Sequence, residues 1–413
     1  MPALSFAHSV VKKLAAAGHT AYYAGGCVRD RLMGHPSDDI DIATSASVEQ
    51  IQALFPKTIP VGVAFGIVIV VENGHQFEVA TFRKESGYTD GRRPTSIEPA
   101  TPEEDAKRRD FTINGMFWDP LTETLYDYVD GQADIARKVI RAIGDPHERF
   151  LEDRLRMMRA VRYSTRFNFE IETETMQSIL SHASTLLPAV AMERVWQEFK
   201  KMSQFAHFDK GLLLLHRLNL LPTIFPALKG LPLETIEKRL TPLAQFPKYA
   251  PTIADVVELF PDHSLEELFE LCDYLKLSRS ERDIVEFLHR AKALLHMPLS
   301  WQENLEKAEW ARFYANAHAE VCLAIYAARL PPQEKANFAE FHAAKRKPLE
   351  KAILRIREQS PLINAALLMK EGISPGAQMG KLLKEAERYS INAECEEPQK
   401  IIHFLKNSAL WNT

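Results

Sequence analysis

The sequence predicts an α+β protein in which a mixed N-terminal part precedes a long helical remainder. Before residue 145, short β-rich runs alternate with helical stretches and are separated by glycine and Asn-Gly turn signals. After residue 145, Leu- and Ala-rich segments with helical spacing follow one another and are joined by proline-containing loops. The length of 413 residues suggests two to four domains.

The N-terminal part is expected to contain several short strands and at least two helices between them. Each strand run is rich in β-branched and aromatic residues and ends near a turn signal. The strands are expected over residues 20–26, 39–44, 65–74, 75–83 and 125–131, and the helices from Val28 and over residues 47–55.

The bulk composition is that of an ordinary globular protein, with 46% hydrophobic and 26% charged residues. A net charge of −4 means that nucleic-acid binding would have to come from local basic patches. The sequence has no signal-peptide core and no apolar run long enough to span a membrane. We therefore expect a cytoplasmic protein with free thiols at its four widely spaced cysteines, Cys27, Cys272, Cys322 and Cys395.

The stretch SDDIDIAT at residues 37–44 places acids on a strand that is about to be buried. The period of two in a strand puts Asp39 and Asp41 on one face, and Ile40 and Ile42 on the other. Two neighbouring carboxylates repel each other, and a divalent metal ion would compensate for that repulsion. The alternative is an acidic turn at the edge of a strand.

The stretch YYAGGCVRD leads directly to these acids. A strand that runs into Gly25-Gly26 and then into a helix leaves backbone amides free for a triphosphate. Arg29 would reach phosphate, and Asp30 would hold either Arg29 or a ribose hydroxyl. The alternative is a glycine turn that is needed for steric reasons alone.

Glu78 supplies a third acid in the run HQFEVATFR. Because Phe77 and Val79 share one face of this strand, Glu78 points to the other face. It would help to hold a catalytic metal ion or accept the proton of an attacking hydroxyl. The alternative is a structural salt bridge to Arg83.

Several motifs together resemble a known family. GGCVRD followed by DDIDIAT resembles the core of the polymerase-beta nucleotidyltransferase superfamily. With RRDFTING at 108–115, FLEDRLRMMRAVRY at 150–163 and GISPGAQMGKLL at 372–383, the chain resembles class II tRNA nucleotidyltransferases and bacterial poly(A) polymerases. The resemblance implies a polymerase-beta-like head domain (1–144), a helical neck (145–205), and a helical body and tail that bind RNA (206–413).

A single helix is expected over residues 145–163. Asp145 would cap this helix, Pro146 would occupy its first turn, and Glu148 would complete a capping box. Projection at helical spacing predicts one apolar stripe, made of Leu151, Leu155 and Met158.

The opposite face of this helix carries Arg149, Asp153 and Arg156. These side chains alone would indicate a solvated ion pair worth a few tenths of a kcal/mol. The resemblance instead implies a nucleotide-reading motif, EDxxR, in which Asp153 and Arg156 pair with the base, Glu152 positions Arg156, and Arg159 lies near phosphate. An acceptor beside a donor suits cytosine and adenine but mispairs with uracil and guanine.

The motif RRDFTING contributes Arg109, Asp110 and Asn114. The resemblance implies that Asp110 and Asn114 line the ribose and metal region, which would favour ribonucleotides. Arg109 would then lie near the bound nucleotide. The alternative for the adjacent arginines is surface charge that has no part in phosphate binding.

Residues 83–105 are rich in Gly, Pro and charged side chains, which is typical of a mobile surface loop. The resemblance implies that the segment YTDGRRP at 88–94 belongs to a loop that is shortened in relatives adding only cytidine. Its presence here predicts the ability to add adenosine. The alternative is a disordered connector.

The helical remainder offers weaker signals. Trp196 lies among core-spaced residues and is expected to pack rather than to stack on a base. Lys347, Lys351 and Arg355 have a spacing that suits phosphate contacts, although a plain solvated face explains them as well. The motif at 372–383 is expected to form a turn into a helix.

The sequence therefore predicts an enzyme that adds CCA to the 3′ end of tRNA from CTP and ATP, with release of pyrophosphate. Asp39 and Asp41 would hold two Mg²⁺ ions, and Glu78 would complete the catalytic set. We expect no DNA partner and no membrane partner, and the sequence does not determine the oligomeric state. The alternatives are an enzyme that adds only the terminal A, a poly(A) polymerase, a transferase acting on another substrate, and a non-catalytic RNA-binding protein of the same fold.

Overall fold

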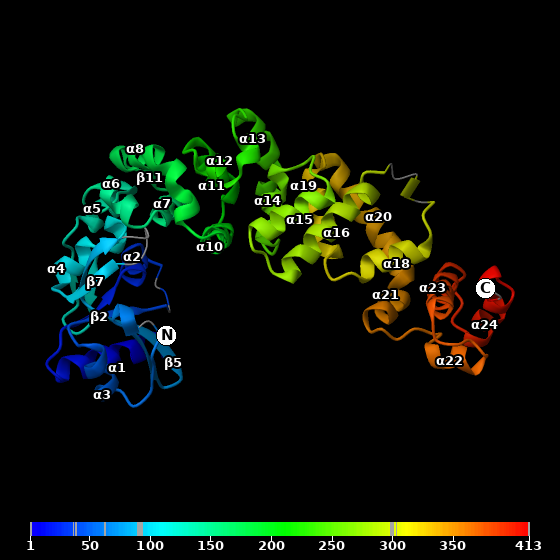
Figure 1. The fold of residues 1–413 in the computed structure, drawn as a ribbon, viewed down its shortest axis with the longest axis horizontal. Coiled ribbons are helices and arrows are strands. Elements are labelled where there is room, and N and C mark those ends of the chain that lie inside the picture. The colour runs from blue at the N-terminus through cyan, green and yellow to red at the C-terminus, as the bar shows by residue number, and fades with distance from the viewer. Residues whose placement is uncertain are drawn as a thin grey trace. The chain divides into compact units, whose positions relative to one another are not determined.

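The computed structural model describes residues 2–35, 37, 39–61, 63–88, 94–297, 301–302 and 304–411. The chain forms two compact units, residues 1–240 and 241–413. Within the described residues, the strands all lie in the first unit and the second unit is helical (Figure 1). This arrangement confirms the expected α+β architecture. The expected domain boundaries near residues 144 and 205 stay predictions.

A seven-stranded sheet organises the N-terminal part, in the order β3-β4-β5-β2-β1-β8-β9. Neighbouring strands pair antiparallel, except β2 and β5, which are parallel. The strands are β1 (Ala21–Ala24), β2 (Asp41–Thr44), β3 (Thr58–Ile59), β4 (Ile67–Glu72), β5 (His75–Thr81), β8 (Phe117–Asp119) and β9 (Thr124–Tyr126).

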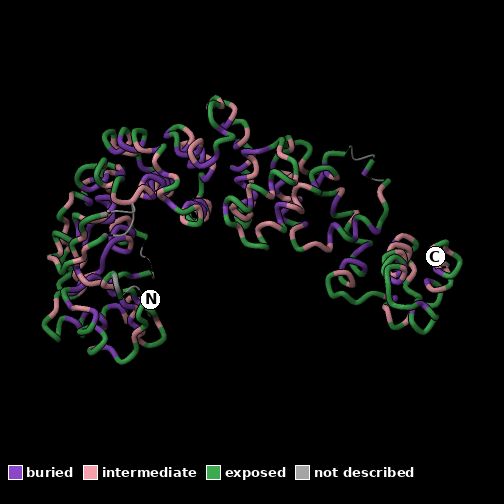
Figure 2. Tube along the Cα trace, in the orientation of Figure 1, coloured by how far each residue is buried: buried purple, intermediate pink, exposed green. Residues whose placement is uncertain are grey.

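One face of this sheet is buried beneath two helices, α1 (Pro2–Ala16) and α3 (Val48–Leu54). The side chains of Val68 and Val70 from β4 and of Val79 from β5 belong to the core on this side. Figure 2 shows how buried and exposed residues are distributed along the chain. The alternate residues of β4 and β5 point the other way and are half-buried or exposed. That second face stays open where β2 begins, and this opening positions the candidate site.

The rest of the first unit is mainly helical. A short parallel pair, β10 (Val139–Ile140) and β11 (Glu170–Ile171), interrupts the expected all-helical neck. The helices are α2 (Gly26–Leu32), α4 (Pro102–Lys107), α5 (Gly131–Arg137), α6 (Pro146–Glu152), α7 (Leu155–Phe167), α8 (Thr173–His182), α9 (Leu186–Ala189), α10 (Met192–Ser203), α11 (Phe208–Arg217), α12 (Leu220–Ile224) and α13 (Leu233–Leu240).

The prediction of a single helix over residues 145–163 is wrong. The beginning of α6 matches the prediction, because the Asp145 side chain accepts a hydrogen bond from a first-turn amide and a proline follows it. Among the described residues, however, Glu148 completes no capping box with Asp145. The helix ends at Glu152, and α7 begins only at Leu155.

The break between α6 and α7 has a local cause. Asp153 adopts an extended conformation (φ −144°, ψ 104°), and its Oδ1 accepts a hydrogen bond from the Leu155 amide at 3.0 Å. Aspartate competes for backbone amides in this way and so favours turns over continued helix. Leu155 and Met158 are buried as predicted, but Leu151 is 47% exposed because the break removes it from the stripe.

The connector at residues 83–105 is more ordered than expected. Strands β6 (Arg83–Tyr88) and β7 (Pro94–Pro99) pair as an antiparallel hairpin, and α4 follows with a capping box formed by Thr101 and Glu104. The alternative of a disordered connector is therefore wrong for the described part, whereas the expected role in adenosine addition stays a prediction. Most of the 88–94 motif lies outside the described residues.

The second unit consists of packed helices, and its described apolar residues include one core cluster around Trp310 and another around Leu368. Within the described part of the chain, no helix is long and apolar enough to cross a membrane. The helices are α14 (Thr252–Val256), α15 (Leu265–Tyr274), α16 (Arg279–Leu295), α18 (Lys307–Ala315), α19 (Ala319–Arg329), α20 (Pro332–Arg346), α21 (Glu350–Arg357), α22 (Ala365–Lys370), α23 (Ala377–Asn392) and α24 (Pro398–Lys406).

The weaker sequence signals are resolved in part. Trp196 is 2% exposed, which confirms that it packs in the core. The motif at 372–383 turns at Gly376 into α23, as expected. Lys351 and Arg355 lie 3.4 Å and 3.8 Å from Glu396 oxygens, so part of their charge is balanced within the chain. All four cysteines are free thiols.

Candidate active site

Three carboxylates come together where β2 begins on the open face of the sheet. Asp41 opens β2 and Asp39 precedes it by two residues, and both are exposed, whereas Ile42 is buried. In the parallel pair, Ile42 lies opposite Val79, so one residue earlier Asp41 lies beside Glu78. Glu78 is also exposed. The alternation predicted from both strands is confirmed.

These carboxylates interact unfavourably. Although Asp41 keeps part of its surface exposed, the surrounding protein removes water from its carboxylate, and this desolvation raises the pKa of Asp41 to about 7. The negative charges of Glu78 and Asp39 add to the shift, and Arg109 opposes it. The salt bridge from Glu78 to Arg83 does not form within the described residues, since Arg83 pairs with Glu85 at 2.6 Å. The site therefore holds more negative charge than the nearby protein cations balance.

This donor set fits a hard divalent cation. Mg²⁺ is usually held by one or two carboxylates together with substrate phosphates rather than by an all-protein cage. Within the part of the chain that the structure describes, no group of three or more His, Cys, Asp or Glu side chains is arranged to hold a metal ion. Asp39 and Asp41 would thus provide the protein's share of the ligands, and a bound triphosphate would provide the rest.

A glycine turn lies next to the carboxylates. Gly25 has φ 69° and ψ −125°, a conformation that favours glycine, and a Cβ there would lie 3.0 Å from Arg109 Nη1. Helix α2 begins immediately after it at Gly26, two residues before the expected start at Val28. The free amides of this first turn and the positive end of the helix dipole suit phosphate.

Arg29 is buried and has several partners. Its Nε donates to Asp30 Oδ1 at 2.8 Å, another of its nitrogens donates to Asn114 Oδ1, and its guanidinium lies 4.6 Å from the Phe167 ring centroid. The second Asp30 oxygen accepts from Arg166 Nη2 at 3.1 Å. Of the two roles considered for Asp30, the structure places it on Arg29. Arg166 was not singled out from the sequence.

Asp110 is held by two neighbours. Its Oδ2 accepts from Arg159 Nε at 2.8 Å, and its Oδ1 accepts from Asn114 Nδ2 at 3.1 Å. Burial alone would raise the pKa of Asp110, but Arg159 and these hydrogen bonds outweigh it and hold the pKa at about 2. The same ion pair raises the pKa of Arg159. Asp110 is therefore ionised at neutral pH and fixed in place.

Asp105 organises the adjacent arginines, although sequence reasoning missed it. The residue is 1% exposed; its Oδ1 accepts from Arg108 Nε at 2.8 Å and its Oδ2 from Arg109 Nη2 at 2.9 Å. These two cations hold the pKa of Asp105 below its ordinary value in spite of burial. An i, i+3 and i, i+4 spacing to two arginines was the available signal.

The residues predicted to read the nucleotide are also held by neighbours. Arg156 Nη1 donates to Glu152 Oε2 at 2.6 Å, and its Nη2 donates to the Arg108 carbonyl at 3.1 Å. Asp153 Oδ2 accepts from Arg194 Nη2 at 2.8 Å. Each carboxylate oxygen keeps a further lone pair and the guanidinium has five donors, so both side chains can still contact a base.

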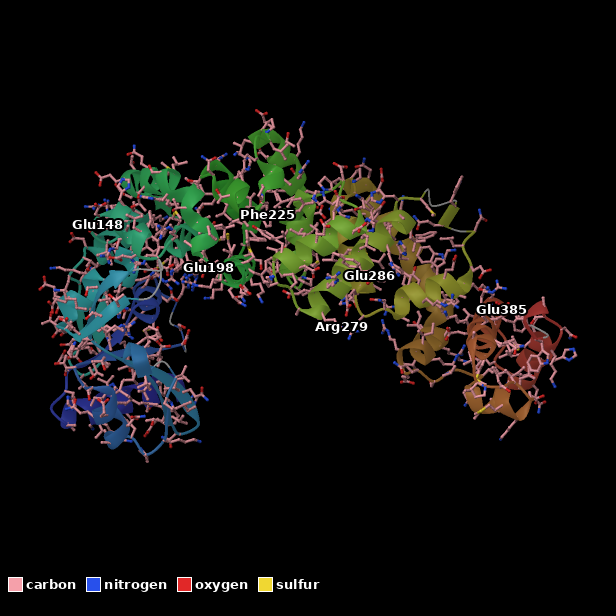
Figure 3. All side chains as sticks on the ribbon, in the orientation of Figure 1. Glu148, Glu198, Phe225, Arg279, Glu286 and Glu385 are labelled. Carbon is pink, nitrogen blue, oxygen red and sulfur yellow. The ribbon has the colours of Figure 1, made fainter. Side chains whose placement is uncertain are left out.

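A buried ion pair connects α7 to α10. Arg162 Nε donates to Glu198 Oε2 on α10 at 2.6 Å, and both side chains are buried. Glu198 is labelled on the first unit in Figure 3. The pair joins the two helices that carry Arg156 and Arg194 and so fixes their spacing. Sequence reasoning missed this pair because its members are 36 residues apart.

These groups line one cleft of about 410 Å³. Its wall is strongly basic, with eight arginines and three aspartates. The lining residues are Gly25, Gly26, Arg29, Asp41, Arg108, Arg109, Asp110, Asn114, Asp153, Leu155, Arg156, Arg159, Arg162, Tyr163, Arg166 and Arg194. A pocket of this size and charge can take a nucleoside triphosphate, with its phosphates near the glycine turn and Asp41.

Comparison with known proteins agrees with this geometry. The chain is 34% identical to the CCA-adding enzyme of Pediococcus pentosaceus over 396 residues, which is 94% of this chain and 93% of that protein. The chain belongs to the CCA-adding enzyme family. The match to the CCA-adding enzyme of Streptococcus mutans reaches 44% identity over 49% of this chain and 50% of that one.

Further comparisons match two segments of the chain and its fold as a whole. The family "Poly A polymerase head domain" matches residues 21–141, and "Probable RNA and SrmB-binding site of polymerase A" matches residues 168–231. The crystal structure of the Bacillus stearothermophilus CCA-adding enzyme with CTP is 30% identical, with a TM-score of 0.81 over 98% of this chain and 97% of that chain. The resemblance seen in the sequence is thereby confirmed.

In this member of the CCA-adding family, the predicted site residues separate into two groups. The cleft is lined by Gly25, Gly26, Arg29, Asp41, Arg109, Asp110, Asn114, Asp153, Arg156 and Arg159. The lining does not include Asp30 and Glu152, each of which pairs with a lining arginine, or Asp39 and Glu78, which act electrostatically on Asp41. Their individual roles stay predictions.

Proposed function

We propose that this chain completes the CCA end of tRNA by adding C and A, one at a time, from CTP and ATP. The observation that carries the proposal is that one basic cleft contains both the predicted metal-binding carboxylate and the predicted base-reading residues. Asp41, which lies beside Glu78, and the proposed base-reading pair Asp153 and Arg156 line the same cleft. A cytoplasmic location follows from the tRNA substrate.

Nucleotidyltransferases of this family generally use divalent metal ions, and we assign two Mg²⁺ ions to Asp39 and Asp41. When bound, the ions would neutralise triphosphate charge and lower the pKa of the attacking hydroxyl. The glycine turn and Arg109 would hold the phosphates. Glu78 lies beside Asp41 and would accept the proton of the attacking 3′ hydroxyl as pyrophosphate leaves.

Base selection follows from the donors and acceptors of Asp153 and Arg156. A carboxylate that accepts from an exocyclic amine and a guanidinium that donates to a ring nitrogen suit cytosine and adenine. Uracil and guanine present the reverse pattern, and each buried mispaired group costs about 1–3 kcal/mol. Because Glu152 and Arg194 hold the two side chains, the pair is organised before the nucleotide binds.

The family comparison supports this proposal. The solved relative from Bacillus stearothermophilus was crystallised with CTP, and the long relatives are CCA-adding enzymes. The base-reading residues 152–156 lie between the two segments matched by family descriptions, at 21–141 and 168–231. Since residues 152–156 lie outside both matched segments, the proposed base selection is supported by the contacts of Asp153 and Arg156 and by the similarity to the relative that matches nearly the whole chain.

The test is incorporation of labelled CTP and ATP, separately and together, on tRNA transcripts that end before CCA, after C and after CC. We expect CTP to extend the first two transcripts and ATP to add one residue to the third. Extension of only the CC-ending transcript, by one A, would identify an enzyme that adds the terminal A alone. Long A tails on any RNA would identify a poly(A) polymerase.

A gel shift with Asp39→Ala addresses the non-catalytic alternative. If the chain is an enzyme, this variant binds tRNA like the parent protein but incorporates no nucleotide. An RNA-binding protein without activity would show no incorporation in the parent protein either, and its tRNA binding would be unaffected by added divalent ions and nucleotide.

A further inference from the structure

A row of side chains crosses the open face of the sheet and ends at the carboxylates. Ile59 of β3 pairs with Ile69 of β4, Ile69 pairs with Glu78 of β5, and the parallel register places Asp41 beside Glu78. Residues paired directly across strands point to the same face, and neighbouring strands lie about 4.8 Å apart. Ile69 is thus the neighbour of Glu78, and Ile59 is one strand farther out.

The outer part of this face is apolar and accessible. Ile59 is 36% exposed, and Ile67 and Ile69 are half-buried. We call Ile59, Ile67 and Ile69 the apolar shelf. Further exposed apolar residues follow β3 in the chain: Val61, Val63 and Phe65. Single exposed apolar residues are common on protein surfaces, but a group of them beside a reactive centre indicates a binding surface.

The shelf and the basic cleft lie on opposite sides of Asp41. On one side, β1 pairs with β2, and Ala24 opposite Asp41 leads into the glycine turn at Gly25. On the other side lie Glu78 and then the shelf. The shelf residues are not among those that line the cleft. Its three isoleucines offer no positive charge, so the shelf suits a ribose and base rather than a triphosphate.

We propose that the apolar shelf holds the terminal nucleotide of the RNA 3′ end and so directs its 3′ hydroxyl towards the carboxylates. This inference rests on the proposed function. In phosphoryl transfer, the attacking and leaving oxygens lie roughly in line across the phosphorus. With the triphosphate in the cleft, the attacking oxygen must approach from the opposite side, which is where the shelf lies.

The step balances with groups already named. The 3′ oxygen forms a bond to the α-phosphorus, and the bond from that phosphorus to the α–β bridging oxygen breaks. Pyrophosphate carries away the electron pair of the broken bond. The hydroxyl proton passes to Glu78, which lies between Asp41 and the shelf. The shelf residues take no part in bond making and act only as positioning residues.

Steady-state kinetics with Ile59→Thr and Ile69→Thr test the shelf. Threonine keeps the β-branched shape that strands favour but removes apolar contact. We expect KM for a tRNA ending in CC to rise about five- to tenfold, with KM for ATP and kcat changed less than about twofold. The control is Leu121→Ala, because Leu121 is 40% exposed between β8 and β9 at the opposite edge of the sheet.

The outcomes separate the shelf from the proposed function. An unchanged KM for tRNA in both variants, or an equal rise in KM for ATP, would overturn the shelf while leaving the function intact. No incorporation by the parent protein would instead remove the proposed function. If Ile69→Thr does not fold, a photo-crosslinker at residue 59 decides the question. It should label the 3′-terminal nucleotide, whereas the same group at residue 121 should not.

Discussion

Two aspartates in the wall of the cleft have opposite electrostatic environments. Asp110 is paired with Arg159 and has a pKa of about 2. Asp41 instead lies beside Glu78 and near Asp39, and its pKa is raised to about 7. Both aspartates belong to the same wall, so the difference comes from their partners and not from the depth of the cleft.

This difference shows what each aspartate requires from outside the chain. Where the protein supplies both charges, as at Asp110 and Arg159, the side chains are already oriented. The same holds for the predicted base-reading pair, because Arg194 holds Asp153 and Glu152 holds Arg156. Where the protein supplies carboxylates without enough cations, the repulsion is relieved only by protons or by metal ions. The following predictions test this contrast, from the largest expected effect to the smallest.

The largest effect is expected from Asp41→Asn. Removing this carboxylate should lower the rate of nucleotide incorporation at least about 10³-fold, because metal-assisted charge stabilisation contributes several kcal/mol to such reactions. Single-turnover incorporation on a CC-ending tRNA measures the loss, and a gel shift should show unchanged tRNA binding. Glu123→Gln, at an exposed acid on the far edge of the sheet, should leave the rate unaffected.

The second prediction is that Asp110→Asn acts on stability. The change leaves the Arg159 guanidinium without its main counter-charge, and breaking such a pair costs about 3 kcal/mol. Urea denaturation at pH 7 measures the loss. The contribution of Asp110 is present above its ordinary pKa of 3.8 and is lost only as the pH falls towards about 2. A variant as stable as the parent would show that this pair is not a structural tie.

Base selection should depend on Asp153. In Asp153→Ala, the preference for CTP over UTP should fall about thirtyfold, which corresponds to about 2 kcal/mol of lost discrimination. Competition between the two nucleotides on a transcript that lacks CCA measures the change. Glu148→Ala, at a neighbouring position of α6, is the control (Figure 3). Equal loss in both variants would assign selection to the fold of α6 and not to Asp153.

The smallest effect concerns the stability of the metal-free protein. The folded-state pKa of Asp41, about 7, exceeds its ordinary value of 3.8, so the folded state binds more protons between these pH values. Stability should therefore fall as the pH rises from about 4 to about 7. After allowance for solvent screening of this exposed group, Asp41→Asn should be about 1 kcal/mol more stable than the parent at pH 8 in EDTA, and equal to it at pH 4. Urea unfolding midpoints of the variant and the parent at both pH values measure the difference. A variant that is less stable than the parent at pH 8 would contradict the statement that the ionised Asp41 carboxylate destabilises the metal-free protein.

Much of the fold could be predicted from local sequence patterns. The alternation of Asp39 and Asp41 with buried isoleucines, the inward Phe77 and Val79, and the start of α6 at Asp145 could each be predicted from a few neighbouring residues. The break at Asp153 could not, because it depends on a side chain that bonds its own backbone against a helical pattern. The same holds for strands β6 and β7, where pairing overrides a loop-like composition.

Site residues could be predicted where a single motif contains the reactive groups. Contacts between residues that are far apart in the sequence were missed. Asp41 and Arg156 carry recognisable patterns. Arg166 meets Asp30 across 136 residues, and Arg162 meets Glu198 across 36. No periodicity connects such positions, so only the folded chain shows that they brace the cleft. Asp105 is intermediate, since its spacing to Arg109 was visible but its burial was not.

The most direct test of the contrast is calorimetric titration of the protein with CTP and with UTP, first in Mg²⁺ and then in EDTA. If the pair formed by Asp153 and Arg156 is organised without metal, both affinities should fall in EDTA while the preference for CTP over UTP is preserved. Loss of the preference in EDTA would contradict the account. It would show that metal binding at Asp39 and Asp41 is needed to shape the pair formed by Asp153 and Arg156.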